Sequence, residues 1–378
     1  MSALITGIGA VSSVGADRTA TFDALCAGRS GLAPLRGFDP ANYRARNAYE
    51  IDDRTGPGTD HPLRSTRWLI DAVAEALADA GMDENLAGVP VLIGTTLREL
   101  RSVELNWCDA APFDPAALHF GTALRRRFAA ESTYTVANAC SASLYALGLG
   151  TDLLDLGEAD TVVVAGADTL TESTYGMLDR VYREAPDSVR PFDRDRRGML
   201  QGDGAAAVVL RRDPSAGAKP YARVAGVGFN CDAHHPSAPD ARSIGRVMRD
   251  AHARAGVKPD DIDLVLLHGT GTPLNDEAEA VALTEVFAGV PLTPRMTAVK
   301  SMIGHTAGAS GLHSLITAVQ ALGSGRVPPT LGLIDPMPEM ADFRVAREPV
   351  IDHELSLAQI DSFGFGGLNA VAVVEKVA

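Results

Sequence analysis

Cysteine and lysine are both scarce in this chain of 378 residues. The four cysteines are widely separated and form neither a disulfide framework nor the paired spacing of a metal site: Cys26, Cys108, Cys140 and Cys231. We therefore expect no bound metal and a reducing, cytoplasmic compartment. Only four of the 34 basic residues are lysines, so a lysine within a motif is less easily explained by chance.

Long apolar runs and an excess of positive charge are also absent. No run approaches the roughly 20 apolar residues that a membrane-spanning helix needs, and the N-terminus lacks the basic stretch of a signal peptide. The net charge of −14 argues against a general nucleic-acid role. With 46% hydrophobic residues, 37 glycines and 22 prolines, the composition is that of an ordinary α/β protein with no membrane partner.

One short stretch joins a predicted strand to a predicted helix through a cysteine. Thr133–Val136 is β-branched and aromatic, which favours a strand, and Leu144–Gly157 is apolar on nearly every side and free of proline, which favours a buried helix. Cys140 lies between them among small residues. A thiol at a helix N-terminus is favoured as thiolate by the helix dipole. A lone cysteine is as often a core residue, so this stretch alone leaves both interpretations open.

Strand-like and helix-like segments alternate along the rest of the chain. Thr161–Gly166 is uniformly apolar, as strands of parallel sheets are. The pattern restarts near residue 217, where Tyr221–Gly228 repeats the character of Leu4–Gly9. The alternation predicts an α/β fold of two similar halves, residues 1–215 and 216–378.

Some segments carry weaker signals. Residues 31–63 contain several prolines and are expected to form a loop. Arg98–Pro115 is expected to cross the surface, and Asp168–Arg197 to be mostly loop with a short helix. Ala370–Lys376 is predicted to be the last strand.

Three later turns are rich in glycine and polar residues: His268–Thr272, Lys300–Ala309 and Phe363–Asn369. Two of them hold a histidine, His268 or His305, flanked by glycine and threonine at the end of a strand or in a loop. Binding and catalytic groups concentrate at such positions. Two histidines in the second half, with a cysteine at a similar position in the first, predict a catalytic constellation.

These motifs together resemble the β-ketoacyl-acyl carrier protein synthases, the elongating condensing enzymes of the thiolase-like superfamily. The resemblance runs over almost the whole chain and includes Arg190–Asp193 and Gly202–Gly204. It implies the thiolase fold, a five-layer αβαβα sandwich of two similar halves, and usually a dimer. It also implies that no cofactor is bound, because the substrates arrive on the phosphopantetheine arm of an acyl carrier protein.

The resemblance implies a role for each motif. Cys140 is expected to carry the acyl chain, and His268 and His305 to donate hydrogen bonds to the enolate formed when a malonyl-type thioester loses CO₂. Lys300 is expected to position or balance the charge of the histidines. Further residues are expected to form the oxyanion hole and gate, which are Phe365, Gly366 and Gly367, and to bind substrate, which are Thr270, Thr272 and Asn369.

The sequence departs from the family pattern in places. Fatty acid synthases of this kind usually carry a glutamate where this chain has Ser314, beside His313. The usual ion pair with Lys300 is then in doubt, and Glu279 is an alternative partner. The Gly-Glu-Gly turn of the family carries Asp203 here. Residues 51–66 and 97–119 look compressed, and with Ser314 this favours polyketide or other specialised biosynthesis.

Alternative functions remain open at this point. A thiolase would use a second cysteine late in the chain, and an initiating synthase would pair its cysteine with His and Asn; neither pattern fits well. A chain-length-factor-like partner subunit and a non-decarboxylating acyltransferase using Cys140 are the remaining alternatives. The enzyme could be a homodimer or half of a heterodimer. Basic candidates for docking the acidic carrier protein are Arg125, Arg126, Arg127, Arg194, Arg196 and Arg197.

Overall fold

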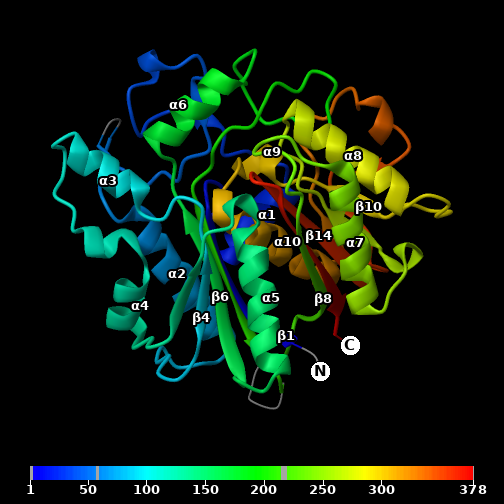
Figure 1. Ribbon diagram of the computed structural model, residues 1–378, viewed down its shortest axis with the longest axis horizontal. Coiled ribbons are helices and arrows are strands. Elements are labelled where there is room, and N and C mark those ends of the chain that lie inside the picture. The colour runs from blue at the N-terminus through cyan, green and yellow to red at the C-terminus, as the bar shows by residue number, and fades with distance from the viewer. Residues whose placement is uncertain (1–2, 57–58, 214–218, 378) are drawn as a thin grey trace.

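A computed structural model describes residues 3–56, 59–213 and 219–377 (Figure 1). Eleven of its strands form one continuous sheet, in the order β12-β10-β9-β14-β15-β8-β1-β7-β6-β4-β5. The first half supplies β1 (Ala3–Ser12), β4 (Val91–Gly94), β5 (Thr133–Val136), β6 (Thr161–Asp168) and β7 (Gly204–Arg211). The second supplies β8 (Ala222–Cys231), β9 (Leu264–Leu266), β10 (Arg295–Thr297), β12 (Arg344–Val345), β14 (Leu357–Gly364) and β15 (Leu368–Lys376).

The strand order of the first half is repeated in the second. From the middle of the sheet outward, β1-β7-β6-β4-β5 corresponds to β8-β15-β14-β9-β10. The two halves meet where Ala3–Ile5 of β1 pairs antiparallel with Ala222–Val224 of β8. Two similar α/β halves are thus confirmed. The predicted boundary at residues 215 and 216 lies outside the described residues.

Helices cover both faces of each half and fill the space between them (Figure 1). On the outer face of the first half lie α2 (Arg64–Asp79) and α4 (Gly121–Phe128). Between the halves lie α1 (Arg18–Cys26), α5 (Ala142–Asp155) and α10 (Ser310–Ser324). On the outer face of the second half lie α7 (Ala241–Ala255) and α8 (Pro273–Val286). The arrangement is a five-layer αβαβα sandwich, as expected.

The burial pattern explains why these strands form the middle of the sandwich. In β6, Val162 and Val164 pack into the core between the halves, whereas Val163 and Ala165 face α2 and α4. Both sides of such a strand are buried, so it is apolar at every position rather than at alternate ones. The central helix α10 is buried on nearly every side for the same reason.

Among the elements of eight residues or more, two were not predicted. The segment expected to cross the surface contains α3 (Leu100–Trp107), whose Arg101, Ser102 and Glu104 are buried. The central strand β14 also escaped notice, because it carries polar residues at buried positions. Gln359 contacts His252 Nε2 at 2.6 Å and donates to Asp361 at 2.8 Å, so its polar groups are satisfied inside the sheet. The segment expected to hold a short helix contains α6 (Glu172–Val181).

The remaining elements are short. They comprise α9 (Lys300–Ile303), the hairpin-like pair β2 (Ala33–Pro34) and β3 (Asn47–Ala48), and the pair β11 (Arg326–Val327) and β13 (Val350–Ile351). Within the described part of the chain, no helix is both long and apolar enough to cross a membrane.

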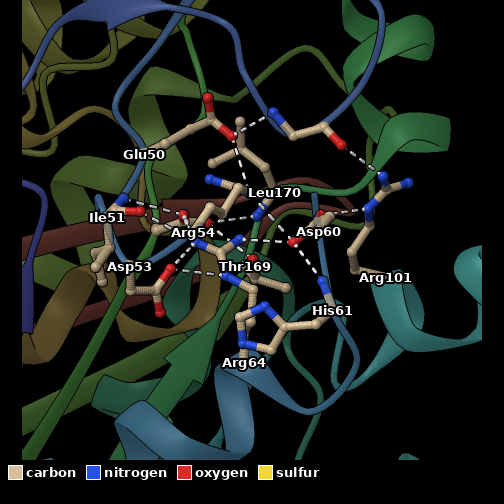
Figure 2. Close-up of polar contacts among 12 residues, drawn as sticks. Glu50, Ile51, Asp53, Arg54, Asp60, His61, Arg64, Arg101, Thr169 and Leu170 are labelled. Carbon is tan, nitrogen blue, oxygen red and sulfur yellow. Dashed lines mark hydrogen bonds and ion pairs between the residues drawn. The ribbon is translucent and has the colours of Figure 1, made fainter. Parts of the chain in front are cut away.

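A network of buried charges holds the proline-rich loop region against the first half (Figure 2). Arg64 at the start of α2 is only 1% exposed and contacts Asp60 at 3.3 Å and Asp203 at 3.1 Å. Arg54 and Glu50, which both belong to this loop, form an ion pair at 2.9 Å. Asp203 also accepts from the Thr169 hydroxyl and the Leu170 N–H. The network therefore links the loop to the residues that follow β6 and precede β7.

Candidate active site

A pocket of about 650 Å³ lies at the ends of the central strands and is lined by Cys140, His268 and His305. Cys140 comes from the turn between β5 and α5, His268 from the loop after β9, and His305 from the loop after α9. The three residues are separated by up to 165 positions in the sequence. The two similar halves bring them together because the equivalent ends of their sheets open into the same space.

Backbone geometry places Cys140 at the base of the pocket. Ala139 has a φ of +50°, a left-handed conformation that turns the chain sharply out of β5 and into α5. The Ser362 hydroxyl in β14 donates to the Cys140 carbonyl oxygen at 2.9 Å. A Cβ atom on Gly364 would lie 3.2 Å from the Cys140 nitrogen, so the two loops approach closely. Cys140 is consequently 9% exposed, but its position opens into the pocket.

The helix N-terminus does not make Cys140 a resting thiolate. Burial raises the pKa of its thiol to about 11, since the charged form is poorly solvated there. The positive charge of Lys300 and the backbone N–H of Phe365 act in the opposite direction on that pKa, without overcoming the burial. Burial therefore outweighs the groups that favour the thiolate, and the sulfur carries its proton at neutral pH in the resting site.

The loop of Phe365, Gly366 and Gly367 lies over the cysteine. Both glycines have positive φ angles, +83° and +75°. The Gly366 N–H donates to the Pro236 oxygen at 2.8 Å, and the Asp232 N–H donates to the Gly367 oxygen at 2.9 Å. Phe365 is 43% exposed, and its N–H acts on the sulfur of Cys140. The loop is thus fixed at its glycines and carries an exposed ring at the pocket.

The hydrogen bonds of His305 determine which ring nitrogen carries the proton. The Ala307 N–H donates to Nδ1 at 3.1 Å, so Nδ1 has no proton of its own. Burial and the charge of Lys300 lower the pKa of His305 well below its usual value, and the ring is neutral. The proton then resides on Nε2, a buried atom without a hydrogen-bond partner among the described residues. His305 presents an unused N–H donor.

His268 is arranged in a comparable way. Lys300 Nζ lies 3.3 Å from its Nδ1, and an ammonium can only donate, so the proton of the neutral ring resides on Nε2. Burial, Lys300 and His305 all lower the pKa of His268 well below its usual value. The two rings are 5.6 Å apart and nearly perpendicular, at 83°. The pocket therefore contains two neutral imidazoles, each with an Nε2–H donor.

Lys300 makes its direct contacts with His268 rather than with a carboxylate. Its ammonium donates to the His268 carbonyl oxygen at 2.6 Å. Burial lowers the pKa of Lys300 to about 8, and the charge of Glu279 is the first factor that opposes this shift. Glu279 itself accepts the N–H groups of His268 and Gly269, at 2.7 and 2.9 Å. Glu279 thus acts on Lys300 through its charge and through the backbone of His268, not through a direct ion pair. Ser314 is buried in α10.

The other predicted site residues lie in different places. Thr270 and Thr272 line the pocket, with their hydroxyl oxygens 2.8 Å apart. Asn369 does not belong to the pocket wall: it is 1% exposed, and its amide donates to Asn230 and Asp232, at 2.9 and 2.7 Å. Its position is that of a residue holding the strand end beneath the Gly367 loop.

The two groups of candidate docking arginines are separated. Arg194, Arg196 and Arg197 line the pocket. Arg125, Arg126 and Arg127 lie on α4, which packs on the outer face of the first half, low in the view and away from α6 and α8 (Figure 1). Arg127 is engaged in an ion pair with Glu84, at 2.6 Å.

Sequence reasoning missed a buried carboxylate close enough to Cys140 to act on the pKa of its thiol. Asp168 at the end of β6 accepts from the Thr95 hydroxyl at 2.7 Å and from the N–H groups of Thr96, Leu97 and Gly308 at 2.8, 2.8 and 2.6 Å. Burial raises its pKa to about 6. It ties the loop after β4 to the turn that begins α10. The sequence did contain a signal for Asp168, because an aspartate at the end of an apolar strand is unusual in a core.

Comparisons with known proteins agree with this geometry. Residues 2–216 match the family described as the N-terminal domain of beta-ketoacyl synthase, and residues 221–333 match its C-terminal domain. The ketoacyl synthase alpha subunit of the tetracenomycin polyketide synthase of Streptomyces glaucescens is 31% identical over 99% of this chain and 96% of its own length. The 3-oxoacyl-[acyl-carrier-protein] synthase 2 of Coxiella burnetii is 27% identical over 99% and 98%. A solved structure, the ishigamide ketosynthase/chain length factor, is 32% identical with a TM-score of 0.89, covering 100% of this chain and 99% of that one.

Proposed function

Because this chain belongs to the β-ketoacyl synthase family and is a condensing enzyme of the type II fatty acid and polyketide kind, we propose that Cys140, His268 and His305 carry out its reaction. The observation that carries the proposal is that two neutral imidazoles, each with an Nε2–H donor, share one pocket with a single cysteine. Its two halves are residues 1–215, which hold Cys140, and residues 216–378, which hold both histidines.

In the first step Cys140 takes the acyl chain. Its sulfur forms a bond to the thioester carbonyl, the carbon–sulfur bond to the arm breaks, and the thiol proton passes in net terms to the departing arm. The tetrahedral oxyanion accepts hydrogen bonds from the N–H groups of Cys140 and Phe365, both of which act on the sulfur. The close approach of Gly364 to the Cys140 nitrogen supports this oxyanion hole.

In the second step a malonyl-type thioester loses CO₂ and becomes an enolate. The Nε2–H groups of His268 and His305 donate to the enolate oxygen while its charge develops. Neutral rings suit this role, because a protonated ring would also attract the carboxylate before CO₂ leaves. The enolate carbon then bonds to the acyl carbonyl carbon, the bond to Cys140 breaks, and the sulfur takes up a proton. Lys300 positions the His268 ring.

The substrates are carried on the phosphopantetheine arm of an acyl carrier protein, with Thr270 and Thr272 along the arm. Arg194, Arg196 and Arg197 at the pocket are the positive groups offered to an acidic carrier, which would compete with their carboxylate neighbours Asp335, Asp276 and Glu184. The α4 arginines, Arg125 to Arg127, are the less suitable docking group, because they lie away from the pocket. Asn369 supports the Gly367 loop rather than binding substrate. The pathway is polyketide or related specialised biosynthesis.

The edge strand β5 supports a dimer. It ends the sheet, and Tyr134 on it is 55% exposed, so its unpaired backbone groups are available to a second subunit. A second copy of this chain or a homologous subunit fits such an edge. The comparisons do not favour the alternative that this chain is itself the chain length factor.

The test is intact mass after incubation with acyl-carrier thioesters. We expect a mass gain equal to the acyl group on the wild type and none on Cys140→Ala. Addition of malonyl carrier should then remove the adduct and form a β-ketoacyl product. Absence of an adduct with every thioester, also in the presence of a homologous subunit, would overturn the proposal.

A further inference from the structure

Asp361 in β14 is a buried carboxyl that the reaction described above does not use. It is 1% exposed and directly precedes Ser362, whose hydroxyl donates to the carbonyl oxygen of Cys140. Its Oδ1 accepts from Gln359 Nε2 at 2.8 Å, whereas its Oδ2 is buried without a hydrogen-bond partner among the described residues. A charged oxygen is costly to bury without a donor, so we expect Oδ2 to carry a proton.

A chain of two hydrogen bonds fixes the orientation of Asp361. His252 Nε2 on α7 lies 2.6 Å from Gln359 Oε1, and an amide oxygen only accepts, so the histidine donates there. The amide nitrogen of Gln359 therefore faces Asp361 Oδ1, to which it donates. Burial lowers the pKa of His252, so its ring stays neutral and adds no charge to the site. Oδ1 remains an acceptor, and a proton on Asp361 resides on Oδ2.

A second buried carboxyl, that of Glu279 on α8, lies at the same level on the same side of the sheet. Ile360 is the register partner of Leu266 in β9, so Asp361 lies level with Leu267, about 4.8 Å away across one strand spacing. Ile360 and Leu266 pack between the halves, and successive side chains alternate, so Asp361 and Leu267 face α7 and α8. There Glu279 accepts the backbone N–H that follows Leu267, at 2.7 Å.

Both oxygens of Glu279 are occupied, in contrast to those of Asp361. Oε1 accepts the His268 N–H at 2.7 Å, and Oε2 accepts the Gly269 N–H at 2.9 Å and the Asn275 amide at 3.3 Å. Three N–H donors favour the charged form of a carboxyl. Burial and the charge of Asp361 raise the pKa of Glu279, so the two carboxyls oppose each other's ionisation. Of the two, Asp361 is therefore the one that keeps a proton.

We propose that Asp361 and Glu279 form a buried carboxyl pair that holds one proton at neutral pH, carried by Asp361, and that this pair is the counter-charge of Lys300. Lys300 touches His268 but no carboxylate, so its charge depends on groups that act without a direct ion pair. Asp361 acts on the chemistry through Lys300 and is thus a positioning residue. The proposal rests on the proposed function only for the role of Lys300 at Cys140 and His268.

Ionisation of Asp361 extends the pH range in which Lys300 stays charged. Burial raises the pKa of Asp361 to about 7, and the bond from Gln359 and the charge of Lys300 oppose this rise. Below that pH the pair carries one negative charge, and above it the pair carries a second, which favours the ammonium. Four other titratable groups act on this ammonium or lie near it and keep their charge near pH 7, namely the thiol, two neutral rings and a carboxylate that accepts N–H groups at both oxygens: Cys140, His268, His305 and Asp276.

The test follows the titration of Lys300 directly by nuclear magnetic resonance. The chain has only four lysines, so lysine isotopically labelled at its ε-carbon gives four signals, and Lys300→Gln identifies the one required. In the wild type we expect a main ionisation near pH 8 and a smaller step near pH 7, from Asp361. Asp361→Asn keeps the acceptor for Gln359 and removes the carboxyl. The step near pH 7 should disappear, and the main ionisation should move to lower pH by about one pH unit.

Asp263→Asn is the matched control. This carboxylate holds the start of β14, where it accepts the N–H groups of Ser356 and Leu357 at 2.8 and 2.9 Å. The variant disturbs the same strand without changing the carboxyl pair, so the Lys300 titration should equal that of the wild type. Alkylation of Cys140 by iodoacetamide is the second measurement. Asp361→Asn should match the wild type below about pH 7 and react up to about tenfold more slowly at pH 8.

An unchanged Lys300 titration in Asp361→Asn overturns the proposal, and so does an equal shift in Asp263→Asn, which would come from the fold of β14. If Asp361→Asn does not fold, the wild type decides: a step near pH 7 in its Lys300 signal supports the proposal, and its absence overturns it. The titration requires no substrate. A Lys300 titration that shifts as expected, with alkylation rates that do not change, therefore supports the carboxyl pair and contradicts the role of Lys300 at Cys140 instead.

Discussion

Lys300 Nζ lies 2.6 Å from the carbonyl oxygen of His268 and 3.3 Å from Nδ1 of the same residue. One ammonium thus holds both the backbone and the ring of a histidine whose other ring nitrogen is free to donate. The same charge opposes the rise that burial causes in the pKa of the Cys140 thiol. Lys300 therefore influences both chemical steps, although it is neither the nucleophile nor a hydrogen-bond donor to the enolate.

Replacing Lys300 with glutamine should slow alkylation of Cys140 by iodoacetamide, by about tenfold for each unit that the thiol pKa rises. The sign depends on pH. Below about pH 8 Lys300 is charged in the wild type and assists the thiolate, so the difference is largest there. Above that pH Lys300 loses its proton and the two rates should converge. A pH-independent difference in alkylation rate would contradict this account.

Replacing His305 with alanine should reduce CO₂ release from malonyl carrier by about 10²–10³, because one of two oxyanion donors is lost. Acylation of Cys140 should remain close to wild type, since His305 acts in the second step. His235→Ala is a suitable control: His235 lines the same pocket, but its Nδ1 accepts the N–H groups of Ser237 and Ala238. Equal losses in both variants would remove the proposed role of His305.

The glycines of the Phe365 loop should differ in their tolerance of alanine. At Gly367 the new Cβ would lie 2.5 Å from Asp232 Cβ, and the φ of +75° is strained for alanine. At Gly366 the nearest atom is 3.9 Å away, so only the conformational cost remains, about 1–2 kcal/mol. We expect Gly367→Ala to slow Cys140 acylation more than Gly366→Ala, measured by intact mass. The reverse order would mean that the loop does not act through its packing on Asp232.

Replacing Arg64 with methionine should destabilise the fold by about 3–5 kcal/mol, because it leaves Asp60 and Asp203 buried without their main positive partner (Figure 2). Arg67→Met, three positions along the same helix, removes an arginine that is nearly half exposed and should cost no more than about 1 kcal/mol. Urea unfolding monitored by circular dichroism measures both. Similar values for the two variants would show that the buried network contributes little.

Local patterns were enough to predict the two similar halves and to single out Cys140, His268 and His305, which the structure brings to one pocket. Small residues and glycines around Cys140, His268 and His305 mark turns at strand ends, and turn geometry is a property of neighbours in the chain. The prediction failed where distant contacts decide the outcome. Gln359 looks unsuited to a central strand until His252 and Asp361 complete its hydrogen bonds.

The sequence alone determined which residues could take part in the chemistry, because residue types and turn signals are written locally in Cys140 and the two histidine motifs. Only the tertiary structure decided their chemical state. The Cys140 thiol keeps its proton because burial outweighs the charge of Lys300, and each histidine presents Nε2–H because its Nδ1 faces a donor, from Ala307 or Lys300. The tertiary structure likewise decided that Asn369 lies outside the pocket wall and that the α4 arginines lie away from the pocket. Solvation and hydrogen bonding depend on what surrounds an atom in space, and for these residues the surroundings come from distant parts of the chain.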